Sequence, residues 1–167
     1  MRYLLITCIF LCNLSGIAAA GSDKDQVLKM LEGRHWKLDF RAFKKLGEDA
    51  DIILIEIAEN DSLMNVIRFR ALDALSLFPS DKTAAFLEET AEKSFTPMAR
   101  RGFETMKRSF AKTKPERVKR LATKLLKHRN ANIRISAARY IRSVDQTLYK
   151  SFINTEKESW VRKAVQK

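Results

Sequence analysis

The sequence predicts an all-α fold in which about five short helical hairpins follow one another as repeats. Apolar residues recur at helical spacing, and no stretch alternates apolar and polar residues over the length of a strand. The 167 residues include only 5 glycines and 3 prolines, fewer than a sheet protein with many tight turns needs. Helix start and stop signals divide the chain into segments of roughly 10 to 15 residues.

Residues 1–20 differ from the rest and predict a cleavable secretory signal peptide. Arg2 gives a positive start, residues 4–14 are mostly apolar, and the alanines at 18–20 supply the small residues of a cleavage site. The apolar stretch is short against the ~20 residues that span a bilayer, so a membrane anchor is the weaker alternative. We therefore expect a repeat domain over residues 21–167, in the periplasm or secreted from the cell.

Five helix pairs follow the signal peptide, and short connections make each pair antiparallel. The expected pairs are 23–33 with 36–46, 49–60 with 64–78, 81–93 with 97–111, 115–128 with 131–143, and 145–157 with 159–166. Ser80 is placed to cap the helix that starts the third pair. Thr113 with Glu116, and Ser143 with Gln146, have the spacing of a capping box. Hairpins in series indicate a repeat architecture.

A basic residue recurs near the start of each second helix, directly after an apolar residue. These residues are Lys37, Arg68, Arg100, Arg134 and Arg162, separated by 31, 32, 34 and 28 positions. The pattern resembles the HEAT repeat, in particular its short bacterial form known from phycobilisome-lyase-like proteins. Asn65-Val-Ile-Arg68 and Asn132-Ile-Arg134 are the closest matches, whereas the first repeat departs by having Lys37 after Trp36. The resemblance covers about residues 23–167.

The resemblance implies an α-solenoid (an alpha-alpha superhelix) whose second helices line a concave side. It also implies that the recurring arginines form a structural ladder, because the equivalent arginine of HEAT repeats commonly pairs with an Asp or Asn in a neighbouring turn. The expected ladder residues are Arg68, Arg100, Arg134 and Arg162. Binding residues are therefore expected among basic positions outside this register.

Charge is distributed unevenly along the chain. Residues 21–92 carry 10 Lys/Arg against 15 Asp/Glu, whereas residues 93–150 carry 17 against 3, within a net charge of +12. A basic half of this kind predicts an anionic partner. A solvated basic surface that keeps the protein soluble is the alternative.

Two basic sets are the candidate binding residues. On second helices the set is Arg101, Arg108, Arg139 and Arg142, and on the first helix of the fourth pair it is Arg117, Arg120, Lys124 and Lys127. We favour the second-helix set because second helices line the groove of such repeat proteins. Arginine also makes bidentate contacts with carboxylate or phosphate groups.

No residue pattern in the sequence predicts a catalytic, cofactor or metal site. The nucleophile-elbow, dinucleotide-binding and phosphate-loop patterns are missing. Cys8 and Cys12 lie in the signal peptide, and His35 and His128 are far apart in the repeat order, so we expect no metal. The acidic cluster over 48–61 lacks calcium-loop spacing and is interpreted as a solvated face. We expect a protein that is not an enzyme and binds no cofactor.

The function predicted from these patterns is a scaffold or inhibitor that holds an acidic protein or peptide on its basic concave side. Trp160 and Val161 on the short last helix are expected to face a partner or a second copy. Nucleic acid is one alternative, because some HEAT-like bacterial DNA glycosylases hold duplex on a basic face, although the signal peptide argues against it. Attachment of the basic run 112–129 to an anionic membrane or envelope polymer is the other.

Overall fold

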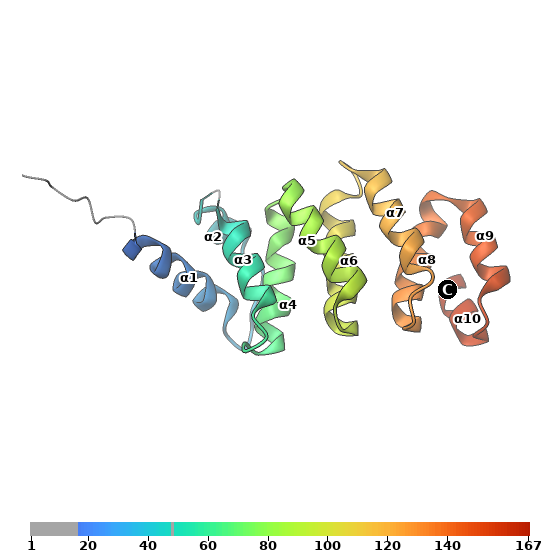
Figure 1. Ribbon diagram of the computed structural model, residues 1–167, viewed down its shortest axis with the longest axis horizontal. Helices are drawn as coiled ribbons and strands as arrows, with labels where there is room; N and C mark the ends of the chain where they lie inside the picture. The colour runs from blue at the N-terminus through green and yellow to red at the C-terminus, as the bar shows by residue number, and fades with distance from the viewer. Residues whose placement is uncertain (1–16, 48) are drawn as a thin grey trace, which may run out of the picture.

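The computed structural model describes residues 17–47 and 49–167, and this part of the chain is all-helical. It contains ten α-helices, one 3-10 turn and no strand. The helices follow one another in chain order along the longest axis of the molecule, from α1 at one end to α9 and α10 at the other (Figure 1). The all-α prediction is therefore confirmed for the described residues.

The helices begin and end close to the predicted boundaries over most of the chain. Their bounds are α1 Ile17–Leu31, α2 Phe40–Lys44, α3 Ala50–Glu59, α4 Asn65–Ala74, the 3-10 turn η1 Leu75–Leu77, α5 Asp81–Lys93, α6 Thr96–Phe110, α7 Pro115–Leu125, α8 Ala131–Val144, α9 Gln146–Thr155 and α10 Ser159–Gln166. The main difference is α2, which is one turn long where the sequence predicts a helix over 36–46. Its start is fixed by Asp39, whose carboxylate accepts hydrogen bonds from two backbone N–H groups of the first turn.

Three of the predicted pairs pack as hairpins: α3 with α4, α5 with α6, and α7 with α8. The first and last predicted pairs do not pack in this way. At the N-terminal end α1 packs on α3 and α4, and at the C-terminal end α9 and α10 both pack on α8. The second helices also contact one another along the row, α4 with α6, α6 with α8, and α8 with α10. We call the surface formed by α4, α6, α8 and α10 the second-helix face.

One apolar core runs through the whole row, from Val27 in α1 to Val165 in α10. Phe43, Phe103 and Phe110 are among its largest fully buried side chains. Burying a phenylalanine side chain stabilises a protein by about 1.5–3 kcal/mol, so these rings help to fix each helix against the next. The core therefore fixes the positions of surface residues on neighbouring helices relative to one another.

The last helix corrects one sequence expectation. Val161 was expected to face a partner together with Trp160, but Val161 is fully buried in the core, and only Trp160 is half exposed. Val161 packs inward because α10 lies against α8.

The helix caps match the sequence signals only in part. Ser80 caps α5 as predicted, and its Oγ accepts a hydrogen bond from the Thr83 N–H at 3.0 Å. The two predicted capping boxes are wrong. Lys114 is the N-cap residue of α7 and makes no side-chain cap bond. Asp145 caps α9 by accepting from the Leu148 N–H at 2.9 Å, because a carboxylate stands closer to the helix start than Ser143 does.

The predicted signal peptide lies largely outside the described residues, which begin at Ile17. α1 continues across the predicted cleavage point after Ala20. No helix in the part of the chain that the structure describes is long and apolar enough to cross a membrane.

Candidate binding surface

Two members of the candidate basic stripe, Arg117 and Lys124, are paired with acidic residues of α5, the first helix of the preceding hairpin. Arg117 donates from Nε and Nη2 to the two carboxylate oxygens of Glu88 on α5, at 2.8 Å each. Two further ion pairs join the same segments: Lys124 with Glu92 at 2.8 Å, and Lys114 with Asp81. We call these three ion pairs the α5–α7 ladder.

The α5–α7 ladder ties up charge that the sequence assigned to a binding stripe. The hydrogen bonds from Arg117 lower the pKa of Glu88, and the same contact raises the pKa of Arg117, so both remain ionised at neutral pH. Arg120 and Lys127, the other members of the stripe, are exposed and have no hydrogen-bond or ion-pair partner among the described residues. The stripe is therefore divided between paired and solvated groups.

Arg101 and Arg108 of α6 converge on one buried carboxylate of α4. Arg101 Nη1 lies 2.7 Å from Asp73 Oδ2, and Arg108 Nη1 lies 3.7 Å from Asp73 Oδ1. The Asp73 side chain is 13% exposed, whereas the two arginine side chains are 42% and 53% exposed. Burial raises the pKa of Asp73 even though the charges of both arginines oppose it. Arg101 is thus held by a hydrogen bond and Arg108 by charge attraction alone, and about half of each side chain stays accessible.

Arg139 and Arg142 of α8 hold the end of the last helix. Arg139 Nη2 donates to the Ala164 carbonyl at 2.8 Å, and Arg142 Nη1 donates to the Val165 carbonyl at 2.7 Å. These carbonyls belong to the last turn of α10, where backbone oxygens accept no hydrogen bond from within the helix. The negative end of the helix dipole also lies there and attracts a cation. A carbonyl fixes a guanidinium in place but does not neutralise its charge.

Two adjoining grooves run over the second-helix face beside these arginines. One groove, of about 520 Å³, is lined by Phe69, Pro97, Arg100, Arg101, Glu104 and Arg108. The other, of about 500 Å³, lies over α6, α8 and α10, where Ser136, Arg139 and Trp160 contribute to its wall. Arg100 and Glu104 line both grooves, so the two grooves meet at α6.

Glu104 is the acidic residue at the point where the grooves meet. Burial acts to raise its pKa, but hydrogen bonds from Lys107 and Ser136 outweigh burial and leave the pKa lowered. Glu104 therefore stays ionised at neutral pH. Glu104 forms an ion pair with Lys107 at 2.7 Å and so neutralises that lysine. Arg100 has no acid within hydrogen-bonding distance among the described residues.

The four predicted ladder arginines separate into two kinds. Three of them donate to a backbone carbonyl before their own helix: Arg68 to Ala58 at 3.0 Å, Arg134 to His128 at 3.0 Å, and Arg162 to Glu156. Arg100 is exposed and lines both grooves instead. The sequence register therefore places Arg100 among structural residues, whereas its surroundings are those of the candidate binding residues.

Arg134 has the most extensive contacts of these four. Its Nε lies 2.7 Å from Glu156 Oε2, and its Nη2 lies 2.7 Å from Glu158 Oε1. The Arg134 and Glu156 side chains are 12% and 5% exposed. Hydrogen bonds from Arg134 lower the pKa of Glu156, which keeps this nearly buried pair ionised.

The described residues contain no group of three or more His, Cys, Asp or Glu side chains that could hold a metal ion. The interpretation of the acidic cluster over 48–61 as a solvated face is wrong for Asp51. This residue is buried and accepts a hydrogen bond from Ser80 Oγ at 2.9 Å. Glu48 lies outside the described residues.

Sequence reasoning missed the acidic partners of the basic sets, although a signal for them exists. The partners stand about the length of one helical hairpin apart in the sequence: 28 positions from Asp73 to Arg101, 29 from Glu88 to Arg117, and 32 from Glu92 to Lys124. Opposite charges at this separation indicate contacts between corresponding helices of neighbouring hairpins.

Comparisons of the chain with protein-family models, with curated proteins and with solved structures give no match.

Proposed function

We propose that this protein is an exported, non-enzymatic scaffold or inhibitor, an α-solenoid of HEAT-like repeats that binds an acidic protein or peptide along its second-helix face. The observation that carries the proposal is the pair of adjoining grooves that share Arg100 and Glu104. Their walls add Arg101, Arg108 and Arg139 to Arg100. Four guanidinium groups at neighbouring positions suit a ligand with several carboxylates.

The arginines of these grooves are partly fixed before any ligand arrives. Arg101 is held by Asp73 and lies 5.6 Å from the centre of the Phe69 ring, and Arg139 is held by the Ala164 carbonyl. Side chains that are already ordered lose less conformational freedom on binding, which favours affinity. An arginine has five N–H donors, so one internal contact leaves others for a ligand.

Aromatic side chains give the grooves a second kind of contact. Phe69 lines the first groove and Trp160, half exposed, lines the second. Buried aromatic and arginine contacts contribute most of the binding energy in typical protein interfaces. We therefore infer a partner segment that combines acidic residues with at least one apolar side chain.

The basic run 112–129 is a weaker candidate for contact with a membrane or nucleic acid. Lys114, Arg117 and Lys124 within it already pair with acids of α5 in the α5–α7 ladder. Each such pair reduces the charge that an anionic surface would attract. A protein partner on the second-helix face is favoured for this reason.

The proposal is tested with a fluorescein-labelled Glu-rich peptide whose anisotropy reports binding. The double variant Arg100→Glu with Arg139→Glu is expected to weaken binding by about tenfold or more, because it replaces two attractive contacts by repulsive ones. The matched control is Lys82→Glu with Lys150→Glu, two exposed residues of α5 and α9. It changes the net charge equally and is expected to leave the affinity within about twofold of the wild type.

Equal losses in the two double variants would contradict a specific second-helix site, because net charge alone would then explain the binding. Duplex DNA and anionic vesicles serve as competitors in the same assay. Displacement of the peptide by either at lower concentration than unlabelled peptide would overturn the choice of an acidic protein partner.

A further inference from the structure

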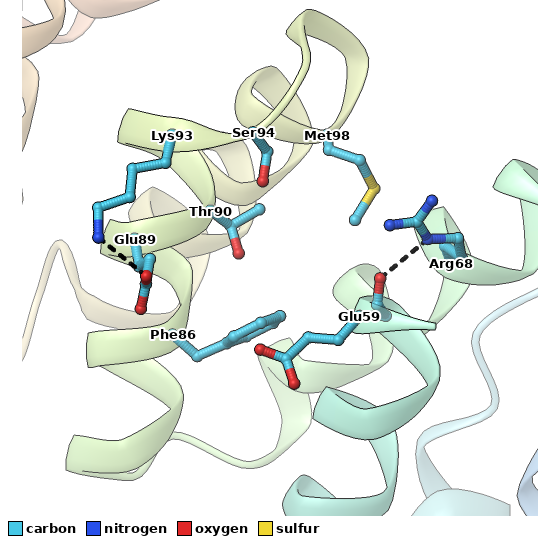
Figure 2. A pocket seen from close by; sticks show the side chains of 9 residues that line it. Glu59, Arg68, Phe86, Glu89, Thr90, Lys93, Ser94 and Met98 are labelled. Carbon is cyan, nitrogen blue, oxygen red and sulfur yellow. Dashed lines mark hydrogen bonds and ion pairs between the residues drawn. The ribbon is translucent and has the colours of Figure 1, made fainter. Parts of the chain in front are cut away.

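A separate pocket of about 350 Å³ lies where the end of α3 and the start of α4 meet the end of α5 and the start of α6. Figure 2 shows Arg68 and Glu59 on one side of this space, and Glu89, Lys93 and Ser94 of the next repeat on the other. Phe86 and Met98 supply the apolar part of its wall. None of these residues lines the grooves of the second-helix face.

We call this space the Arg68 pocket. It has a counterpart two repeats further along the chain. Arg134 is the fourth residue of α8, as Arg68 is of α4, and each donates to a backbone carbonyl before its own helix. The first helix of the following hairpin ends in the C-cap residue Glu156 near Arg134 and in the C-cap residue Ser94 near Arg68. Glu156 and Ser94 are thus equivalent positions in the repeat.

The two equivalent positions differ in charge. Glu156 accepts hydrogen bonds from Arg134 Nε at 2.7 Å and from Arg134 Nη2 at 3.1 Å. Ser94 has no carboxylate to offer. The described residues give Arg68 two acceptors, the Ala58 carbonyl at 3.0 Å from Nε and Asn65 Oδ1 at a long 3.5 Å from Nη1, and no acid. Arg68 therefore lacks the anion that the repeat places beside Arg134.

The pocket contains three charged groups besides Arg68. One is a lysine that is already paired with an acid, and the other two are acids. Lys93 is paired with Glu89 at 3.0 Å on the exposed side of α5. Glu59, which has no ion-pair partner among the described residues, would repel further negative charge on a ligand. The pocket thus favours a single anionic group at Arg68 and an apolar group beside Phe86 and Met98.

We propose that the Arg68 pocket binds a carboxylate that is joined to an apolar group, with the carboxylate on Arg68 in the role that Glu156 has at Arg134. Two sources share this chemistry: the C-terminal carboxylate of a peptide that ends in an apolar residue, and a small free carboxylic acid. The pocket shares no lining residue with the two grooves of the second-helix face.

Binding is measured by NMR on ¹⁵N-labelled full-length protein with N-acetyl-leucine as the probe and N-acetyl-leucinamide as its uncharged control. The acid is expected to shift the Arg68 Nε–H signal and backbone amides between Phe86 and Met98. The amide is expected to bind at least about tenfold more weakly, because it lacks the charge-assisted hydrogen bonds. 3-Methylbutanoate, added separately, distinguishes the sources: weaker binding than N-acetyl-leucine supports a peptide terminus, and equal binding supports a free acid.

Substitutions at Ser94 test the internal comparison. Ser94→Glu is expected to supply the missing carboxylate, raise the Tm and abolish the shifts that the acid causes. Ser94→Gln, of the same shape without the charge, is expected to leave the Tm near the wild-type value and binding within about threefold. Arg68→Gln is expected to remove the preference for acid over amide.

Three results would overturn the proposal. The first is equal binding of acid and amide, and the second is the absence of shifts at millimolar acid. The third is undiminished binding of the acid to a folded Ser94→Glu variant.

Discussion

The positive charges on α7 and those on the second-helix face have different kinds of partner. In the α5–α7 ladder, Arg117 is matched to both oxygens of Glu88, and two lysines pair with acids of the same helix. On the second-helix face, Arg139 and Arg142 contact only backbone carbonyls, and Arg101 and Arg108 share one carboxylate. Arg117 and Lys124 of α7 are thus neutralised by acids of α5, whereas Arg139 and Arg142 of α8 are held in position without a neutralising acid.

This difference shows that a basic half of a sequence is not the same as a basic surface. The acidic residues that pair with Arg117 and Lys124 belong to α5, which lies in the acidic part of the sequence. The positive charge available to a partner is therefore the charge that is left unpaired after contacts between neighbouring hairpins are taken into account. On the second-helix face that remainder includes Arg100 of α6 and Arg139 of α8, which line the grooves and have no acidic partner among the described residues.

Reversing a charge in the α5–α7 ladder is expected to have the largest effect on stability. Arg117→Glu would place a third carboxylate against Glu88 and Asp81, so we expect a loss of about 2–3 kcal/mol in the free energy of unfolding. The value is below that for a fully buried pair because both side chains are about a quarter exposed. Urea denaturation measures it. Lys127→Glu, solvated near the same helix, is the control, with an expected change within about 0.5 kcal/mol.

The nearly buried pair between α8 and α9 is expected to show a slightly smaller, pH-dependent effect. Glu156→Gln is expected to cost about 2 kcal/mol at pH 7, since Glu158 remains to pair with Arg134. Arg134 lowers the pKa of Glu156 below its ordinary value of 4.5. The stability that this carboxylate contributes is therefore present above pH 4.5 and is lost as the pH falls below it.

Denaturation of wild type and Glu156→Gln between neutral and acid pH tests this. The difference in unfolding free energy is expected to be constant near neutrality and to shrink in acid. A difference that stays constant into acid would show that the ion pair is not its source.

The sequence predicts most helix positions but not the ion pairs between helices. The bounds of α5 match the predicted range 81–93, because Ser80 and Pro79 give an unambiguous start. The predicted helix over 36–46 is shorter in the structure, Phe40–Lys44, because residues 36–38 are not helical and Asp39, whose backbone is extended, caps the helix start. Periodicity places each arginine on a helix and beside an apolar stripe. It does not predict which side chain of the neighbouring hairpin lies within hydrogen-bonding distance of each arginine, because that depends on how the core packs one hairpin against another.

Removing the shared carboxylate of the second-helix face is expected to change stability little and binding more. Asp73→Asn is expected to alter the free energy of unfolding by less than about 1 kcal/mol, because the lost attraction of Arg101 and Arg108 is offset by the removal of a buried charge. Burial raises the pKa of Asp73, so its ionised form opposes folding as the pH rises through that pKa. The released arginines are expected to bind the labelled Glu-rich peptide about threefold to tenfold more tightly. Weaker binding would mean that Asp73 is needed to position the arginines.

The smallest effect is expected at the end of α10. Arg142→Gln removes a donor to the Val165 carbonyl, and we expect a loss of about 0.5–1 kcal/mol together with faster hydrogen exchange in the last turn of α10. Hydrogen exchange measured by mass spectrometry reports the change. Lys150→Gln on α9 is the control, and a similar acceleration in this variant would remove the role assigned to Arg142.

The position of a bound acidic peptide tests the central claim most directly. A Glu-rich peptide that carries a photoreactive benzoylphenylalanine is cross-linked to the protein, and the linked residues are identified by mass spectrometry. Cross-links are expected on α6, α8 and α10, around Arg100, Arg139 and Trp160. Cross-links concentrated on α5 and α7 would contradict the assignment of the second-helix face as the binding surface.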